Sequence, residues 1–324
     1  MQTYKSDKEA IDAFVQKFND LKQEVGKVIV GQEDVIDNVL ISIFSKGHGL
    51  LVGVPGLAKT LLINTIAQAL GLTYNRIQFT PDLMPSDIIG TEILGKERNF
   101  EFIRGPVFSN IILADEINRT PPKTQSALLE AMQEKSVTVA GKRYILEEPF
   151  FVLATQNPIE QEGTYPLPEA QLDRFMFNIW LDYPTFEEEV NVVKNTTTGV
   201  MATPKEILTR EEILYFQELI RRIPVPDNVY EYAVKLVSKT RPETDSAHDW
   251  ANQYLSWGAG PRASQYLIIG AKCHAAIHGK YSPDIENIRA VATSILRHRI
   301  VKNYKAEAEG IRIEDIVAEL TKGM

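Results

Sequence analysis

The stretch Gly53-Val54-Pro55-Gly56-Leu57-Ala58-Lys59-Thr60 decides how the first half of this chain is interpreted. The apolar run 49–54 leads into it, and the helical run 61–70 follows it. A strand, a glycine-rich turn and a helix in this order let backbone N–H groups close around phosphate oxygens at a helix N-terminus. We therefore expect a nucleotide-binding P-loop, in which Lys59 reaches the β- and γ-phosphates and the Thr60 hydroxyl binds Mg²⁺. The nucleotide-contacting residues expected here are Gly53, Pro55, Gly56, Leu57, Ala58, Lys59, Thr60 and Leu61.

One position of this loop departs from the usual pattern, because Ala58 stands where a glycine normally precedes the lysine. Alanine is the smallest change from glycine, and it tolerates helical φ and ψ angles. The loop is therefore still expected to close.

Two carboxylates follow the apolar run Ile111–Ala114, about fifty residues after the P-loop. They belong to Asp115 and Glu116, and the carboxyl edge of a parallel sheet is where such folds bind their ligands. We expect Asp115 to hold Mg²⁺, directly or through water, and Glu116 to activate the attacking water. A strand that ends in Asp-Glu is a weak signal alone and a strong one after a P-loop.

Three further residues are candidates for contact with the γ-phosphate. Asn157 ends another apolar run, and there we expect it to polarise the attacking water or to sense the γ-phosphate. The dipeptide Asn-Pro is also common in turns, and without the other motifs it would favour a simple turn. Arg174 lies just before the last core strand, and Arg262 opens a helix of the second half. Either arginine could neutralise charge on a transferring phosphoryl group, although a lone arginine is more often in a surface salt bridge.

The order of the predicted elements indicates an α/β fold. Strands alternate with helices up to Pro184, which predicts a parallel sheet with helices on both faces, a three-layer αβα core. Two β-hairpins, near 88–104 and 137–146, interrupt this alternation. From residue 185 the pattern is helical. We therefore expect a P-loop core over 1–184 and a smaller all-helical lid domain over 185–324.

Composition limits the possible environments and partners. The net charge of −8 argues against a broad nucleic-acid surface, which must neutralise phosphates. The single cysteine excludes an internal disulfide and fits a reducing compartment. No apolar run is long enough to span a membrane, and the first residues do not form a signal peptide, so a cytoplasmic location without membrane partners is expected.

These motifs together resemble the MoxR branch of the AAA+ ATPases. The resemblance covers nearly the whole chain, in order, and only residues 1–25 carry no signature. It is carried by Gly53–Thr60, Pro81–Asp87, Gly105–Phe108, Ala114–Arg119, Lys123–Met132, Ala154–Pro158, Leu167–Phe175, Gly258–Ser264 and His298–Ile300.

The resemblance implies a role for each candidate residue, with ATP and Mg²⁺ as cofactors. Asn157 corresponds to sensor 1, Arg174 to an arginine finger acting on the neighbouring subunit's ATP, and Arg262 to sensor 2, which reaches over the nucleotide from the lid. Val30, Gly31 and Gln32 correspond to the segment beside adenine and ribose. A finger supplied by a neighbour implies a ring, most often a hexamer. The family is associated with chaperone-like maturation of protein complexes, with protein clients and von Willebrand A domain partners.

Four functional hypotheses remain at this point. The leading one is a ring-forming, Mg²⁺-dependent ATPase that remodels or matures protein complexes. The alternative is the ATPase subunit of a magnesium- or cobalt-chelatase-like complex, which shares the two hairpins. A nucleic-acid motor is disfavoured by the acidic charge. A scaffold that binds ATP without turnover is disfavoured because it needs no residue to activate water.

Overall fold

The computed structural model describes residues 4–95, 99–160, 162–197 and 202–322. Its centre is a five-stranded parallel sheet in the order β2 (Tyr74–Gln78), β5 (Ile111–Asp115), β8 (Phe151–Gln156), β1 (Gly49–Val52) and β9 (Phe177–Trp180). Strands β1 and β5 are buried along their whole length, as expected for a parallel sheet covered on both faces.

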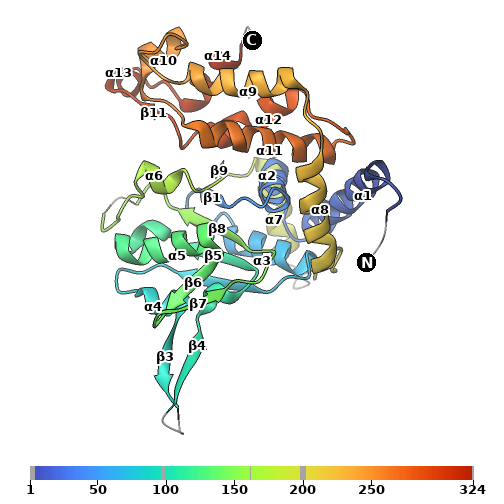
Figure 1. Ribbon diagram of the computed structural model, residues 1–324, viewed down its shortest axis with the longest axis vertical. Coiled ribbons are helices and arrows are strands. Elements are labelled where there is room, and N and C mark those ends of the chain that lie inside the picture. Colours follow the sequence, from blue (N-terminus) through green and yellow to red (C-terminus); the bar gives the residue numbers. More distant parts are fainter. Residues whose placement is uncertain (1–3, 96–98, 161, 198–201, 323–324) are drawn as a thin grey trace.

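Alternate residues of the strands point to the two faces of the sheet. Leu51 and Leu153 pack in a cluster with residues of α1 (Asp7–Gly26), α2 (Glu33–Phe44) and α3 (Lys59–Ala69). Leu50 and Val152 pack on the other face with residues of α5 (Pro122–Glu134). Figure 1 shows the helices on both sides of the sheet. This confirms the predicted three-layer core.

Two hairpins leave the core at the side of α5. They are β3 (Gly90–Leu94) with β4 (Phe100–Arg104), and β6 (Ser136–Val139) with β7 (Lys142–Ile145). The first projects farthest from the body (Figure 1), and its turn residues 96–98 lie outside the described part of the chain. The rings of Phe102 and Tyr144 stack with centroids 4.0 Å apart, which joins the two hairpins. The expected strand start at 88 is wrong, because residues 85–89 form the short helix α4 (Pro85–Ile89).

Most of the C-terminal region is helical. After α6 (Glu169–Leu172) and α7 (Phe186–Thr197), it contains α8 (Arg210–Arg222), α9 (Asp227–Lys239), α10 (Asp249–Tyr254), α11 (Pro261–Ile277), α12 (Ile285–Leu296), α13 (Tyr304–Ala308) and α14 (Ile313–Thr321). The prediction of an all-helical lid needs one correction. Strands β10 (Leu255–Trp257) and β11 (Val301–Lys302) form a small antiparallel ribbon that connects distant parts of the lid.

The lid and the core share one apolar cluster. The ring of Phe14 on α1 lies 4.9 Å from that of Phe44 on α2 and 5.1 Å from that of Phe216 on α8, centroid to centroid. All three side chains are fully buried. The expected domain boundary between residues 184 and 185 therefore marks the change from alternating strands and helices to helices. The hydrophobic core itself continues across this boundary.

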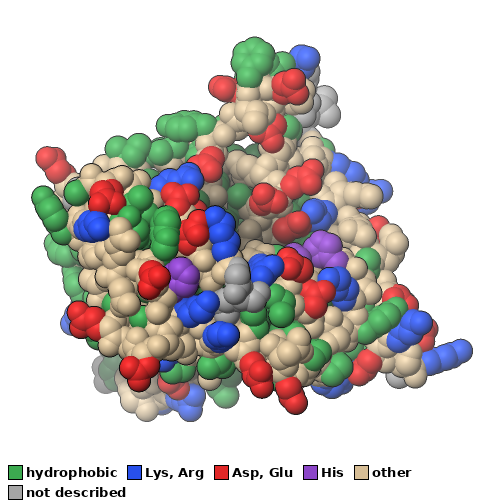
Figure 2. Space-filling model, turned by 90° about the horizontal axis from the view of Figure 1, so that it is seen from above, with side chains coloured by type: hydrophobic (Ala, Val, Ile, Leu, Met, Phe, Trp, Pro, Cys, Tyr) green, Lys and Arg blue, Asp and Glu red, His purple; other side chains and the backbone are tan. Residues whose placement is uncertain are grey.

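The surface over the lid has mixed charge. Figure 2 looks down on this end of the molecule and shows Lys and Arg side chains interspersed with Asp and Glu. On the described atoms of this face the basic side chains do not gather into one broad patch. Within the described residues, no helix combines the length and apolar character that a bilayer span requires.

Candidate functional site

The P-loop connects β1 to α3 at the carboxyl edge of the sheet. Gly53 follows the last residue of β1, and its N–H donates to the carbonyl of Gln156 at 3.2 Å. Lys59 and Thr60 open α3 and are half-buried. The Lys59 ammonium donates to the carbonyls of Gly53 and Val54, the latter at 3.2 Å. Burial lowers the pKa of Lys59, and the carboxylates of Asp115 and Glu116 counteract this effect.

Ala58 does not use the helical φ and ψ angles that alanine tolerates best. It caps the N-terminus of α3 with φ 54° and ψ 25°, in the left-handed region. That region suits glycine, because a Cβ there approaches the following carbonyl oxygen. The loop closes, as expected, but it does so with a strained alanine at the position before Lys59.

A pocket of about 370 Å³ opens beside the P-loop. Its lining contains the predicted residues Val30, Gln32, Pro55, Gly56, Leu57, Ala58 and Leu61, together with Val28, Ile29, Tyr183, Pro184, Glu189, Val192 and Thr196. Its surface is largely apolar, which suits the face of an adenine base. Gln32 adds a polar atom, since its Oε1 is buried with no hydrogen-bond partner among the described residues. Both features fit a nucleotide.

Gly31 lies between the lining residues Val30 and Gln32, and its expected contact with the nucleotide stays a prediction. It has φ +71°, and a Cβ there would lie 2.4 Å from Oε1 of Glu188. Glu188 caps the start of α7 by accepting from the N–H of Thr185 at 2.8 Å. Gly31 therefore lets the 28–32 segment approach α7, which itself contributes to the pocket wall.

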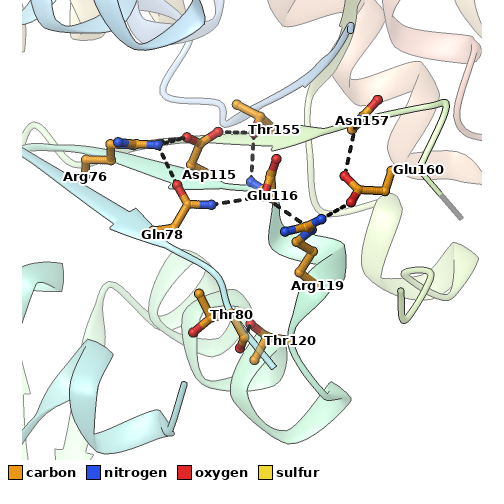
Figure 3. A network of polar contacts seen from close by, with 10 residues as sticks. All are labelled: Arg76, Gln78, Thr80, Asp115, Glu116, Arg119, Thr120, Thr155, Asn157 and Glu160. Carbon is orange, nitrogen blue, oxygen red and sulfur yellow. Dashed lines mark hydrogen bonds and ion pairs between the residues drawn. The ribbon is translucent and has the colours of Figure 1, made fainter. Parts of the chain in front are cut away.

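Asp115 and Glu116 reach the carboxyl edge from β5. Oδ2 of Asp115 accepts from Arg76 at 2.6 Å and Oδ1 from the hydroxyl of Thr155 at 2.6 Å, so the buried carboxylate is held on both sides (Figure 3). Oε2 of Glu116 accepts from Gln78 at 3.0 Å and lies 3.4 Å from Nε of Arg119. Glu116 has φ 57°, and this turn sends its side chain away from that of Asp115.

Asn157 follows β8 and joins the same network. Its Nδ2 donates to Oε2 of Glu160 at 3.3 Å, and its Oδ1 accepts from the N–H of Ile159 at 3.2 Å. Glu160 also pairs with Arg119. Figure 3 shows the resulting chain of contacts from Asp115 to Asn157 along the carboxyl edge. Asn157 therefore lies in a turn that joins the network of the acidic pair, and its role as a sensor stays a prediction.

The two predicted arginines lie at the opposite edge of the sheet. Arg174 and Arg262 line a cavity of about 240 Å³ whose other walls include Lys46, His48 and Phe150. Lys46 and His48 precede β1, Phe150 precedes β8 and Arg174 precedes β9. Because the strands are parallel, this cavity lies at their amino edge, whereas the P-loop lies at their carboxyl edge.

Arg262 therefore lies away from the P-loop of its own chain, and its expected sensor role stays a prediction. Its Nη1 donates to Oδ2 of Asp173 at 2.7 Å, beside Arg174. The lid is placed so that the start of α11 faces the amino edge of the sheet. Arg262 and Arg174 thus form a pair on the side of the molecule away from the P-loop.

Sequence reasoning missed the residues that hold the acidic pair. Arg76, Gln78, Thr155, Arg119 and Glu160 make the contacts just described. For three of them the sequence carries a signal, which is their place near the end of a strand. Arg76 and Gln78 lie two residues apart on β2, and Thr155 lies two residues before Asn157. All three therefore lie near the edge of the sheet where ligands bind. The part played by Arg119 and Glu160 depends on the loops after β5 and β8, which carry no periodic signal.

The oxygen donors at this edge suit a hard cation. Thr60 supplies a hydroxyl and Asp115 a carboxylate, and Mg²⁺ is usually held by one or two such groups together with substrate phosphates. Among the described residues there is no group of three or more His, Cys, Asp or Glu side chains that could hold a metal without such a substrate.

A P-loop with an acidic pair at the carboxyl edge of a parallel sheet, followed by a helical lid, defines a P-loop ATPase. Residues 48–177 match the model of the ATPase family associated with various cellular activities (AAA), and residues 248–320 match an AAA lid domain. Among known proteins, the chain is 44% identical over 298 residues to "Chaperone MoxR1" of Mycobacterium tuberculosis, covering 91% of this chain and 78% of that one. It is 30% identical to "Protein MoxR" of Methylorubrum extorquens, covering 86% of each.

A crystal structure of a candidate ATPase from Cytophaga hutchinsonii superposes with a TM-score of 0.91 at 45% identity, over 98% of this chain and 96% of that one. The chain belongs to the MoxR family of AAA+ ATPases.

Proposed function

We propose that this protein hydrolyses ATP with Mg²⁺ in a ring, where each active site takes arginines from the neighbouring subunit, and that it uses this cycle to mature or remodel protein complexes. The separation of the two halves of the site carries the proposal. The P-loop and acidic pair lie at one edge of the sheet, and Arg174 and Arg262 lie at the other.

The carboxyl edge supplies the binding half of the reaction. The pocket lined by Val30 and Leu61 takes the adenine, and the P-loop N–H groups with Lys59 take the phosphates. Thr60 and Asp115 are the residues that would hold Mg²⁺, which neutralises phosphate charge when it is bound.

Glu116 supplies the base for the chemical step. Its carboxylate is oriented by Gln78 and Arg119, and in the reaction it accepts a proton from the attacking water. Asn157 lies at the end of the adjacent strand, where its amide senses the γ-phosphate or orients this water. These roles follow from position beside the P-loop.

The amino edge supplies the charge that the transition state requires. Arg174 and Arg262 share one cavity there with Lys46, Lys135 and Glu148. The four cationic side chains outnumber the one carboxylate, which suits phosphate oxygens brought by another subunit. An arginine finger contributes about 10³–10⁵ to the hydrolysis rate. In this arrangement both arginines act on the neighbour's ATP.

Mixing two inactive variants tests the shared site. Arg174→Ala keeps a sound P-loop and lacks the finger, whereas Lys59→Ala keeps the finger and lacks the P-loop cation. Each should be nearly inactive alone. When they are mixed under assembling conditions, a Lys59→Ala subunit lends its finger to an Arg174→Ala neighbour, and part of the ATPase activity should return.

Two results would overturn this mechanism. One is full activity of Arg174→Ala at a concentration where light scattering shows only monomers. The other is no recovery in mixtures whose co-assembly is demonstrated by pull-down of differently tagged subunits. Arg241→Ala is a suitable control, because Arg241 is tied to the lid carbonyl of Ala259 at 3.0 Å and lies outside the cavity; it should keep its activity.

The biological role rests on the relatives. A relative named a chaperone supports protein remodelling over metal insertion, and we extend this role to protein clients, a von Willebrand A domain partner and a cytoplasmic location. ATP turnover should rise with the client and stay unchanged with DNA. Stimulation by a tetrapyrrole together with chelatase subunits would instead support the chelatase-like alternative.

A further inference from the structure

Arg299, three residues after the end of α12 in the lid, makes an unexpected ionic contact with the core. It is a charged residue with only 2% of its side chain exposed. It follows α12 and lies against the segment 173–176 that contains Arg174. A buried guanidinium is costly unless all its donors are satisfied, so its partners show what it holds in place.

Among the described residues, every hydrogen-bond acceptor of the Arg299 guanidinium outside α12 belongs to that short segment. Nε donates to Oδ1 of Asp173 at 2.8 Å, and Nη2 donates to the backbone carbonyls of Asp173 at 3.0 Å and Phe175 at 2.6 Å. Nη1 donates to the carbonyl of Met176 at 3.2 Å, and its remaining contact is with the carbonyl of Ile295 on α12. The guanidinium therefore fixes the backbone on both sides of Arg174.

Neighbouring side chains reinforce this arrangement. His298 contacts the carbonyl of Phe175 at 2.9 Å, and the guanidinium carbon of Arg299 lies 5.0 Å from the ring centroid of Tyr266. Tyr266 in turn donates its hydroxyl to the carbonyl of Arg174 at 3.5 Å. Three lid residues thus act on the backbone of one core segment.

Asp173 links this buried anchor to the exposed arginine. Its Oδ1 accepts from Arg299, and its Oδ2 accepts from Arg262 at 2.7 Å. One carboxylate thereby sets the position of Arg262 relative to the backbone that carries Arg174. A lysine at 299 could not reproduce these contacts, because only the planar guanidinium presents five donors in a fixed fork.

We propose that Arg299 and Asp173 are positioning residues that hold Arg174 and Arg262 as one rigid unit for use by the neighbouring subunit. We call the contacts of Arg299 and Asp173 with the segment 173–176 and with Arg262 the clamp. The proposal rests on the function proposed above, because the clamp serves catalysis only if the two arginines act on the neighbouring subunit's ATP. According to this proposal, Arg299 in the lid sets the position of the arginine finger Arg174 in the core of the same chain. Neither positioning residue touches the nucleotide.

The test compares Arg299→Lys and Asp173→Asn with a matched control, Arg297→Lys. Arg297 also joins the end of α12 to the core, by donating to the carbonyl of Asn178 at 3.2 Å, but it forms its ion pair with Glu314. Misplacing a catalytic group by about 1 Å costs on the order of 10²-fold in rate. We expect kcat to fall by about 10- to 100-fold in the first two variants, with the ATP KM within about twofold of the parent and Arg297→Lys near parent activity.

A mixing experiment separates positioning from a general structural defect. Asp173 is partly exposed, so Asp173→Asn tests the clamp even where Arg299→Lys does not fold. Its P-loop is intact, so Lys59→Ala subunits, which carry a correctly held finger, should restore its activity. A kcat loss no greater than in Arg297→Lys, a loss expressed mainly in KM, or no restoration in proven mixed rings overturns the proposal.

The outcome also separates this inference from the proposed function. If Arg174→Ala keeps its kcat, the trans-acting arginine itself is refuted. If Arg174→Ala loses its kcat while Arg299→Lys and Asp173→Asn keep theirs, the finger stands and only the clamp is refuted.

Discussion

Replacing Ala58 by glycine should make the protein more stable, although alanine-to-glycine changes usually do the opposite. Ala58 has φ 54° and ψ 25°, a conformation that costs an L-residue about 1–2 kcal/mol. Glycine removes this strain but loses about 0.4–1 kcal/mol through the greater freedom of the unfolded chain. The net expectation is a gain of about 0.5–1 kcal/mol in the free energy of unfolding.

Ala290→Gly is the matched control for this prediction. Ala290 is exposed in the middle of α12, where glycine should lower the free energy of unfolding by about 0.5–1 kcal/mol. Urea unfolding followed by circular dichroism, without nucleotide, compares the two variants with the parent. The two changes are identical in chemistry and should have opposite signs.

A loss of stability in Ala58→Gly equal to that in Ala290→Gly would refute the reasoning. It would mean that the residue before Lys59 is not held in the left-handed region in solution. The free energy of unfolding should depend on urea concentration with the same slope in all three proteins, because a changed slope reports a change in the surface exposed on unfolding.

Three further predictions concern binding, chemistry and pH. Lys59→Ala should lose most ATP affinity in a nucleotide titration, because the β- and γ-phosphates lose the P-loop cation; unchanged affinity would contradict the P-loop assignment. Glu116→Gln should bind ATP and lose about 10²–10⁴-fold in turnover, because an amide cannot accept the proton of water; parent-like hydrolysis would exclude it as the base. Burial of His48 lowers its pKa to about 4, and its ring accepts from the N–H of Val152 at 3.0 Å and contacts the carbonyl of Met132 at 3.2 Å, which suits the neutral form. Below about pH 6.5 the unfolded chain binds a proton that the folded chain does not, so the free energy of unfolding should fall between about pH 6.5 and 4, by up to about 3 kcal/mol. Urea titrations across this range should show a weaker pH dependence in His48→Gln, and an unchanged dependence would show that His48 does not contribute.

The sequence predicts those parts of the site that are fixed by strand ends. Asp115 and Asn157 each follow an apolar run, and in a parallel sheet such runs end at the same edge. Their meeting with the P-loop therefore follows from local pattern and topology alone. The alternation of strands and helices predicted the layers of the core for the same reason.

The position of the lid could not be derived from local pattern. Arg262 opens a helix, as expected, but which edge of the sheet that helix faces depends on packing between α11 and the helices of the core. The same limit applies to Arg299, whose charge predicts exposure and whose partners are backbone carbonyls. The conformation of Ala58 was missed because the P-loop imposes it against the preference of the residue.

The placement of the P-loop and the paired arginines at opposite sheet edges has a consequence for counting active sites in the proposed assembly. The contact between neighbouring subunits joins two different surfaces, the amino edge of one subunit and the carboxyl edge of the next. Every subunit therefore donates its arginines on one side and receives arginines on the other. An isolated subunit then has no complete site, and an open arc always has one fewer complete site than it has subunits. Only closure makes the two numbers equal, whatever the size of the ring.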